Sequence, residues 1–476
     1  MNHVTRPGRG QAVRRPTTGR RAGPHRGRRR PALALVATAL LALVAGCSGA
    51  GALGAADGAQ TVTVAIVSNP QMKDAITLSP EFERENPGIR LRFVTLSENE
   101  ARAKITASVA TGGGEFDVVM ISNYETPQWA QNGWLTDLEP LMAQTPGYDR
   151  NDFLPTVRDA LSYQGRMYSV PFYAESSFLM YRTDLFARAG LTMPAQPTWP
   201  QVADAAARLD DRQRGGSTAG ICLRGKPGWG EMMAPFNTVV NTFGGRWYDP
   251  QWNAQLTSPQ FEQATQFYVD LARNHGIAGG SQAGFSECGT AFGQGNVAMW
   301  YDSTSAAGTV INPEESKVVG KVGFVPAPVL ATPSSGWLYS WSLAIPKTSP
   351  RVDAAWKFMS WMTSKQYVQL VGNRLGWESA PPGSRTSTYD SPQYQQAAGA
   401  FANTVRDAIV RANPQQPTVE PVPYQGVQFL RIPEFQDLGT RVSQQLSAAI
   451  AGQITPAEAL DQSQKYATTV GESYQR

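Results

Sequence analysis

Three apolar runs decide the fold of this chain: TVTVAIV at residues 61–67, IRLRFVTL at 89–96 and FDVVMI at 116–121. Short runs that are rich in β-branched residues predict buried strands. Two helical segments separate these runs, one around residues 81–85 and one at 100–110. Strand, helix, strand, helix, strand is the order found in parallel sheets that carry helices on their faces. The sequence therefore predicts an α/β fold.

The same alternation continues toward the C-terminus. Roughly 415 residues follow position 60, which is more than one hydrophobic core usually holds, so two lobes are expected. Further apolar runs predict strands, and longer segments with helical spacing predict helices. The strands are expected at 168–172, 178–181, 297–301 and 341–345, and the helices at 201–209, 259–274, 354–362, 365–375 and 394–412.

The first 46 residues have the pattern of an export signal. An arginine-rich segment precedes an apolar stretch at 31–45, and the small residues of LVAGC lead directly to Cys47. This pattern is typical of a secretory signal peptide, and the apolar stretch is too short for a stable transmembrane helix. LVAGC resembles the bacterial lipobox, which implies removal of residues 1–46 and a diacylated Cys47 that anchors the chain stably to a membrane. Residues 47–60 are rich in Gly and Ala and predict a flexible tether.

Three questions about this leader stay open. An ordinary cleaved signal with an incidental cysteine is the alternative to lipidation. Paired arginines leave the twin-arginine route open beside the general secretory route, and the true start codon is uncertain because the charged region is unusually long. Either way, the mature chain is expected to work outside the cytoplasmic membrane.

The basic character of the chain comes from this leader. The formal charge is +4, but ten of the 42 Lys and Arg residues, and none of the 38 Asp and Glu residues, lie in the first 47 positions. The mature chain therefore carries a net charge of about −6. This charge offers no argument for nucleic acid as a partner.

Histidine and cysteine chemistry is nearly absent from the mature chain. Only His275 remains, so no Ser-His-Asp triad and no His-rich zinc site can be assembled, and no phosphate-binding Walker loop occurs. No cofactor or metal is expected. Catalysis by carboxylates alone, as in glycoside hydrolases, stays open. Cys222 and Cys288 form either a disulfide or two buried thiols, because their spacing alone does not show whether they are close.

Aromatic and polar residues stand together at the ends of predicted strands. Charged groups hydrogen-bond hydroxyls strongly, and aromatic faces cover C–H surface and exclude water. Ligands of open α/β sheets bind beyond the carboxyl ends of strands, so the pattern favours a polyhydroxyl ligand. The runs are NYE at 123–125, FYAES at 172–176, RGKPGWGE at 224–231, WYD at 300–302 and GWLYSW at 336–341.

Several of these residues have a structural alternative that stays open. The alternatives are core packing for Trp300 and Trp341, capping for Glu175 and Asp302, a surface ion pair for Arg224 with Glu231, and a turn for Asn69.

Longer stretches of the sequence are similar to one protein family. FERENPGIR (82–90), GGGEFDVVMIS (112–122) and QNGWLTDLEPL (131–141) resemble extracellular solute-binding proteins of carbohydrate ABC importers. The similarity extends from position 61 to the C-terminus. Within that family, ICLRGKPGWGE (221–231) and VPYQGVQFLRIPEFQ (422–436) resemble the sorbitol- and mannitol-binding branch.

The resemblance implies a fold and a set of site residues. The fold is two α/β lobes joined by a hinge, with the ligand in the cleft between them; lobe 1 is expected at 61–170 and 303–345, and lobe 2 at 171–302 and 346–476. Residues that match the family's binding positions follow the first and third strands, the first crossing between lobes and a Trp-rich strand pair. They are Asn69, Tyr124, Tyr173, Glu175, Trp300, Asp302, Trp337 and Trp341, with Arg224, Trp229 and Glu231 as further candidates from a pocket loop.

The resemblance also implies a function. It predicts a monomeric, lipid-anchored receptor on the outer face of the bacterial cell membrane that captures a polyol and delivers it to an ABC permease, without catalysis. A disaccharide receptor for trehalose- or maltose-like ligands, which would use the Trp residues as stacking platforms, is the first alternative. A carboxylate-based glycosidase and a scaffold or adhesin are the others.

Overall fold

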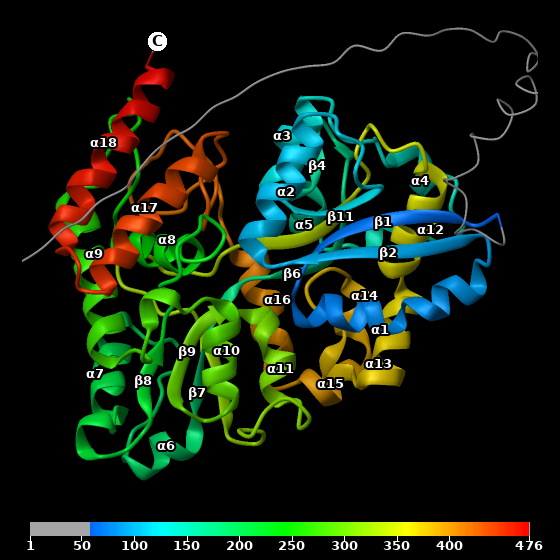
Figure 1. The fold of residues 1–476 in the computed structure, drawn as a ribbon. Coiled ribbons are helices and arrows are strands. Elements are labelled where there is room, and N and C mark those ends of the chain that lie inside the picture. The colour runs from blue at the N-terminus through cyan, green and yellow to red at the C-terminus, as the bar shows by residue number, and fades with distance from the viewer. Residues whose placement is uncertain (1–57, 476) are drawn as a thin grey trace, which may run out of the picture. The chain divides into compact units, whose positions relative to one another are not determined.

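The three N-terminal apolar runs form adjacent strands in the computed structural model, which describes residues 58–475 (Figure 1). Strand β1 (Gln60–Val67) pairs in parallel with β2 (Ile89–Leu96) and with β3 (Val118–Ser122). All of β3 and most of β1 are buried, as expected for strands with helices on both faces. The antiparallel strands β11 (Tyr339–Ala344) and β6 (Val170–Glu175) complete a five-stranded sheet of order β2-β1-β3-β11-β6.

A second sheet has four strands in the order β10-β7-β9-β8. Strand β7 runs antiparallel to both of its neighbours, and β8 runs parallel to β9. The chain passes from the five-stranded to the four-stranded sheet through Ser176, which lies between β6 and β7. The strand bounds are β7 Ser177–Arg182, β8 Ala219–Cys222, β9 Val297–Ser303 and β10 Val322–Pro326, and a small separate hairpin joins β4 Ser162–Tyr163 to β5 Arg166–Met167.

Eighteen α-helices occur among residues 58–475. They are α1 Pro70–Glu85, α2 Glu98–Ala110, α3 Glu125–Gln131, α4 Glu139–Ala143, α5 Pro155–Ala160, α6 Thr183–Arg188, α7 Trp199–Leu209, α8 Met233–Thr242, α9 Pro259–His275, α10 Phe285–Gly293, α11 Ala307–Ile311, α12 Val352–Met362, α13 Lys365–Leu375, α14 Thr386–Asp390, α15 Pro392–Ala398, α16 Ala402–Arg411, α17 Phe435–Ile450 and α18 Pro456–Tyr474.

The helices cover both sheets (Figure 1). On the five-stranded sheet, α1, α2 and α12 pack against β1 or β2, and α3 packs against β3. On the four-stranded sheet, α7, α9 and α10 pack against β8 or β9, and α17 and α18 pack against α9. Helix α16 contacts β6 as well as β7 and β10, so it touches both sheets.

The start of α1 and the start of α2 are fixed by polar caps. The Asn69 side chain accepts a hydrogen bond from the Met72 backbone N–H at 2.9 Å. The backbone N–H and the hydroxyl of Ser97 donate to the Glu100 carboxylate at 3.3 and 2.7 Å. Such caps satisfy backbone donors that the first helical turn leaves unpaired. Because β1 and β2 end just before these residues, both caps lie at the carboxyl edge of the parallel strands.

Most predicted elements are present, with one correction and several omissions. The helix predicted at 394–412 is wrong, because the chain forms two helices, α15 and α16, with Gly399 between them. Glycine weakens a helix, so it is a favourable place for the break. Helices α8, α10, α17 and α18 were not predicted. All ten residues of α8 are buried, so this helix lacks the polar stripe by which an amphipathic helix is found.

Cys222 and Cys288 form a disulfide, with their Cα atoms 5.6 Å apart. The alternative of two free buried thiols is therefore wrong. The bond joins the end of β8 to α10, so it ties together two segments that are 66 residues apart in sequence.

The predicted division into lobes at 61–170, 303–345, 171–302 and 346–476 stays a prediction. In two places the packing differs from it. Strand β10, which falls in a segment assigned to lobe 1, pairs with β7 of the four-stranded sheet, and α12, assigned to lobe 2, packs against β1. A strand's partner depends on long-range pairing, which the local sequence does not encode.

The predicted signal peptide, the lipidated Cys47 and nearly all of the tether lie outside the described residues. Within the described range, none of the helices combines the length and the apolar character needed to cross a membrane.

Candidate functional site

A cavity of about 220 Å³ lies where strand ends from both sheets meet. From the five-stranded sheet, the loop after β1 contributes Asn69, the start of α2 contributes Glu98, and the end of β6 contributes Glu175. From the four-stranded sheet, the loop after β8 contributes Arg224, and β9 ends in Ser303. The position agrees with the general rule that α/β sheets bind ligands beyond the carboxyl ends of their strands.

Arg224 is held by a carboxylate from the neighbouring strand. Its Nε donates to Asp302 Oδ2 at 2.9 Å, and its Nη2 donates to Asp302 Oδ1 at 2.5 Å. Asp302 is fully buried and also accepts a hydrogen bond from Trp300 Nε1 at 3.0 Å. Arg224 Nη1 lies 3.5 Å from the Glu231 carboxylate, and the Phe285 ring lies 5.3 Å from the guanidinium carbon. A two-point ion pair of this kind fixes the guanidinium before a ligand arrives.

Arg102, on α2, has a different set of partners. Its Nε and Nη2 donate to Glu98 Oε1 at 3.0 and 2.8 Å, and its Nη1 donates to Glu125 Oε1 at 3.1 Å. Nη2 also donates to the Tyr339 hydroxyl oxygen at 2.6 Å. The guanidinium carbon lies 4.2 Å from the centre of the Trp229 ring, which is within the range of a cation–π interaction.

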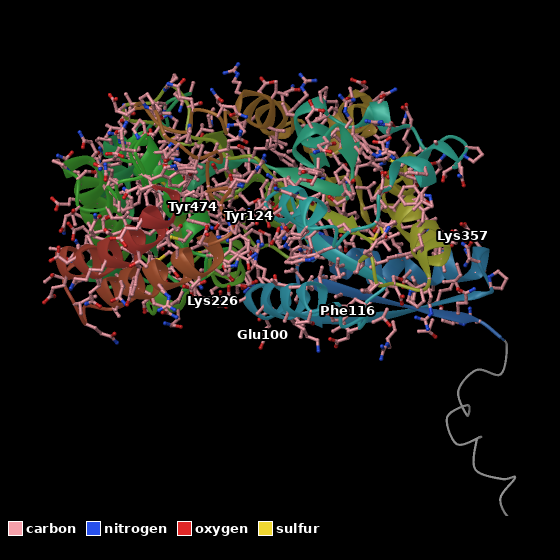
Figure 2. The ribbon with its side chains drawn as sticks, turned by 90° about the horizontal axis from the view of Figure 1, so that it is seen from above. Glu100, Phe116, Tyr124, Lys226, Lys357 and Tyr474 are labelled. Carbon is pink, nitrogen blue, oxygen red and sulfur yellow. A yellow bond between two sulfur atoms is a disulfide. The ribbon has the colours of Figure 1, made fainter. Side chains whose placement is uncertain are left out.

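The loop that carries Trp229 also contacts α2 directly. Asn99 Nδ2 donates to the Pro227 carbonyl oxygen at 2.9 Å. The Asn99–Pro227 hydrogen bond therefore joins the helix of one sheet to the loop of the other. Glu100 on α2 and Lys226 on this loop are both labelled in Figure 2. The pKa of the exposed Glu100 carboxyl is lowered, first by hydrogen bonds from Ser97 and to a smaller extent by the charge of Lys226.

Glu175 is a buried carboxyl group in the cavity wall, and its pKa is raised. It is only 7% exposed, and burial raises its pKa to about 7. Hydrogen bonds from the Ser303 and Ser305 hydroxyls oppose this rise in part, as does the charge of Arg224. None of the cations described at 58–475 forms an ion pair with Glu175. Unpaired buried carboxylates are costly, and they concentrate at functional sites.

Glu231 is the second carboxyl group with an altered titration. Burial raises the pKa of Glu231, and the nearby negative charge of Glu98 raises it further. Arg224 and Lys226, whose ammonium lies 3.7 Å from the Glu231 carboxylate, act in the opposite direction.

Uncharged polar groups complete the wall. Asn69 Nδ2 donates to the Tyr173 hydroxyl oxygen at 3.0 Å, so the cap of α1 also positions this tyrosine. Gln71 Nε2 donates to the Ser305 carbonyl oxygen at 3.1 Å. Together with the two ion-paired arginines, these groups offer both donors and acceptors around one small space.

The structure places seven of the eleven predicted site residues on the cavity wall: Asn69, Tyr173, Glu175, Arg224, Glu231, Trp337 and Trp341. Their role in binding stays a prediction. The other four do not line the cavity. Asp302 and Trp300 support Arg224 from behind, and Tyr124 packs against Trp229, with ring centres 4.9 Å apart.

Sequence reasoning missed a second set of lining residues: Gln71, Glu98, Arg102, Lys226, Phe285, Ser303, Ser305, Tyr339, Gln428 and Phe429. The position of Glu98, directly after a predicted strand, was an available signal. Arg102 gave none, because Glu98 and Arg102 are spaced as an ordinary surface pair on a helix.

Among residues 58–475, no group of three or more His, Cys, Asp or Glu side chains is arranged to hold a metal ion.

Comparisons with known proteins agree with this geometry. Residues 67–369 match the family of bacterial extracellular solute-binding proteins. A mannitol-binding protein of Pseudomonas aeruginosa is 44% identical over 411 residues, which cover 86% of this chain and 93% of the relative.

Two solved structures are similar along nearly all of their length. An ABC transporter solute-binding protein of Agrobacterium vitis S4 with bound D-mannitol has 47% identity and a TM-score of 0.85, covering 87% of this chain and 99% of that one. A solute-binding protein of Agrobacterium radiobacter K84 in complex with ribitol has 25% identity and a TM-score of 0.75, with the same coverage.

These matches confirm the predicted two-lobed α/β fold. They also confirm the resemblance that the sequence motifs indicated, because the similarity is high and covers most of both chains. The chain belongs to the family of bacterial extracellular solute-binding proteins.

Proposed function

We propose that this protein captures a linear sugar alcohol, a hexitol such as mannitol or sorbitol, and presents it to the membrane subunits of an ABC importer. The observation that carries the proposal is the cavity of about 220 Å³, whose wall combines donors such as Arg102 and Arg224 with acceptors such as Glu175. It is supported by high identity to a mannitol-binding protein and to a structure that contains D-mannitol.

The size and the polarity of the cavity favour a small polyol. A volume of about 220 Å³ lies below the usual range of about 300–1,000 Å³ for the pockets of drug-sized ligands, which suits one monosaccharide-sized molecule better than a disaccharide. Arg102 and Arg224 donate to ligand oxygens, and Glu175 accepts from ligand hydroxyls. Hydrogen bonds to charged groups are stronger than neutral ones, and here the charged groups are fixed in advance by their ion pairs.

Binding is coupled to closure of the two lobes. The cavity is lined from both sheets, so only a closed arrangement lets the ligand touch both sets of side chains. A ligand shifts the equilibrium toward the closed state by its differential affinity for that state. The closed, loaded form is then the one that the permease recognises.

The location and the lack of catalysis belong to the same proposal. Residues 1–46 direct export, and a lipid on Cys47 holds a monomeric receptor at the outer face of the membrane, where the tether gives it reach. The relatives are transport receptors rather than enzymes, so the protein releases its ligand unchanged.

A thermal-shift panel of mannitol, sorbitol, arabitol, glucose and trehalose tests the proposal. At about 100 times its dissociation constant, a ligand raises stability by about 2.7 kcal/mol, which is a clear shift in melting temperature. The hexitols are expected to give the largest shift. Stronger stabilisation by trehalose would favour a disaccharide receptor, and no response to any of the five would reject the proposal.

A matched pair of variants ties the response to the cavity. Arg224→Met removes a lining guanidinium and is expected to abolish the hexitol shift. Arg208→Met removes an arginine whose side chain is 51% exposed on α7, and it is expected to leave the shift intact. Equal responses of the two variants would place the ligand elsewhere.

A further inference from the structure

The charges around the cavity are not balanced. Arg102 is paired with Glu98 and with Glu125, and Arg224 is paired with Asp302 and with Glu231. Each arginine therefore already has two carboxylate partners from the protein itself. A ligand that approaches either guanidinium meets a charge that is largely compensated.

The third cation of the cavity, Lys226, also has carboxylate partners. Lys226 lies 3.7 Å from the Glu231 carboxylate and 4.0 Å from that of Glu287. With Glu175 included, six carboxyl groups stand against three cations in and directly behind the wall. The cavity therefore has an excess of negative charge when its acids are ionised.

Glu175 is the carboxyl group through which this excess of negative charge acts on the ligand. It lines the cavity and is nearly buried, and within residues 58–475 it forms no ion pair with a cation. The neighbouring Arg224 is turned toward Asp302 through a two-point contact. The pKa of Glu175 is lowered in part by the neutral hydroxyls of Ser303 and Ser305, and after them by the charge of Arg224.

We propose that the cavity also accepts polyols that carry one terminal ammonium group, bound at Glu175, and that it rejects polyols that carry a carboxylate or a phosphate. This inference rests on the proposed function and defines the substrate class of the same site. An ammonium donates charge-assisted hydrogen bonds to the carboxylate, whereas a neutral hydroxyl donates weaker ones. An anionic group would face the excess carboxylates and would have to displace an internal partner from an arginine.

Calorimetry with three probes of equal chain length tests the inference. Sorbitol is the neutral probe, glucamine replaces one terminal hydroxyl of sorbitol by an amine, and gluconate has a carboxylate in place of one terminal CH₂OH group. At about neutral pH, glucamine is expected to bind about tenfold more tightly than sorbitol, and gluconate at least about 100-fold more weakly. Equal affinities for sorbitol and glucamine, or measurable preference for gluconate, would overturn the inference.

Substitutions identify the group responsible. In Glu175→Gln the ratio of glucamine to sorbitol affinity is expected to fall to about one, because the amide carries no charge. Glu420→Gln makes the same change at an exposed position outside the cavity and is expected to keep the wild-type ratio. A ratio that survives in Glu175→Gln would reject Glu175 as the ammonium site.

Sorbitol, mannitol and glucamine together distinguish failure of the charge preference from failure of the proposed function. Binding of sorbitol without tighter binding of glucamine rejects only the inference about charge. Absence of binding by sorbitol, mannitol and glucamine alike rejects the proposed function and the inference with it.

Discussion

Arg102 and Arg224 both line the cavity and both are paired with acids, yet their surroundings differ. The partners of Arg224 come from the loop after β8, from β9 and from α10, all of which belong to the four-stranded sheet and its helices. The ionic partners of Arg102 come from α2 and α3 of the other sheet, but the Trp229 ring that covers it comes from the loop after β8. The partners of Arg224 therefore all come from its own half of the molecule, whereas Arg102 has one partner from across the cleft.

The difference separates two tasks. The Arg224 arrangement is built by the fold and is present before a ligand arrives. The Arg102 arrangement depends on α2 approaching the loop 224–231, which the Asn99–Pro227 hydrogen bond also requires. Substitutions near Arg224 are thus expected to alter stability and affinity together, while substitutions between α2 and the loop are expected to alter closure.

The largest effect is expected for Asp302→Ala. Removing this fully buried carboxylate leaves the Arg224 guanidinium without its two-point partner, which costs about 3–5 kcal/mol in a buried pair. Unfolding by urea without ligand should show this loss, and calorimetry should show an affinity lower by about 100-fold because the guanidinium is no longer held in place. Asp302→Asn, which keeps the shape, serves as the control and should lose less. An affinity within about twofold of wild type would show that Arg224 needs no such support.

The double variant Cys222→Ala/Cys288→Ala ranks second. The disulfide spans 66 residues, and the loss of a cross-link of this span lowers stability by about 4 kcal/mol in the chain-entropy treatment. Because Arg224 and Phe285 flank the two cysteines, the affinity should fall as well, while the Arg102 contacts stay as they are. Comparing calorimetry at a temperature where both proteins are folded separates the two effects. Unchanged affinity would mean that the loop and α10 hold their positions without the bond.

Gly230→Ala tests the contact across the cleft. A Cβ atom at this position would meet Arg102 Nε and Glu98 Oε1, which belong to α2 of the other sheet. Overpacking of this kind costs about 1–3 kcal/mol, and here the cost arises only in the closed state, so hexitol affinity should fall by about tenfold or more with little change in unliganded stability. Gly88→Ala, where a Cβ atom meets nothing within 4 Å, is the matched control. Equal loss of unliganded stability and affinity in Gly230→Ala would show that this contact forms in the open protein too.

The sequence predicts correctly those features that depend on residues close together in the chain. The apolar runs at 61–67, 89–96 and 116–121 predict the parallel strands because burial leaves a direct compositional trace. Strand ends likewise predict Glu175, Arg224 and other lining residues, since a parallel sheet exposes its functional loops at one edge.

Contacts across the cleft have no corresponding pattern in the local sequence. Trp229 is one of the predicted ligand-binding residues, and in the structure its ring covers Arg102. Tyr124 is another of the predicted ligand-binding residues, and its hydroxyl donates to the Ile432 carbonyl oxygen at 2.6 Å, more than 300 residues away in sequence. Arg102 has the spacing of a solvated helix face and is buried only because another part of the chain packs on it. Tertiary partners decide these roles, and local patterns do not contain them.

The smallest effect on affinity concerns pH and Glu175, which forms no ion pair within the described residues 58–475. Burial raises the pKa of Glu175 from 4.5 to about 7, so the folded protein binds a proton that the unfolded chain has already released between these values. The stability of the free protein therefore falls as pH rises from about 4.5 to about 7, with a total cost of about 3 kcal/mol. Ligand hydroxyls that donate to the carboxylate favour its ionised form, so binding lowers this pKa and releases protons.

Hexitol affinity is accordingly expected to rise severalfold between about pH 5.5 and about pH 8, and calorimetry in two buffers of different ionisation enthalpy should detect the released proton. In Glu175→Gln most of both effects should disappear, and what remains should come from Glu231, which also lines the cavity and whose pKa burial also raises. Asp74, whose pKa burial raises to about 6, does not line this cavity, so Asp74→Asn is the control that should keep the dependence. A hexitol affinity that falls as pH rises would mean that Glu175 binds the ligand in its protonated form, as a hydrogen-bond donor. That outcome would contradict the prediction that the ionised carboxylate accepts from ligand hydroxyls.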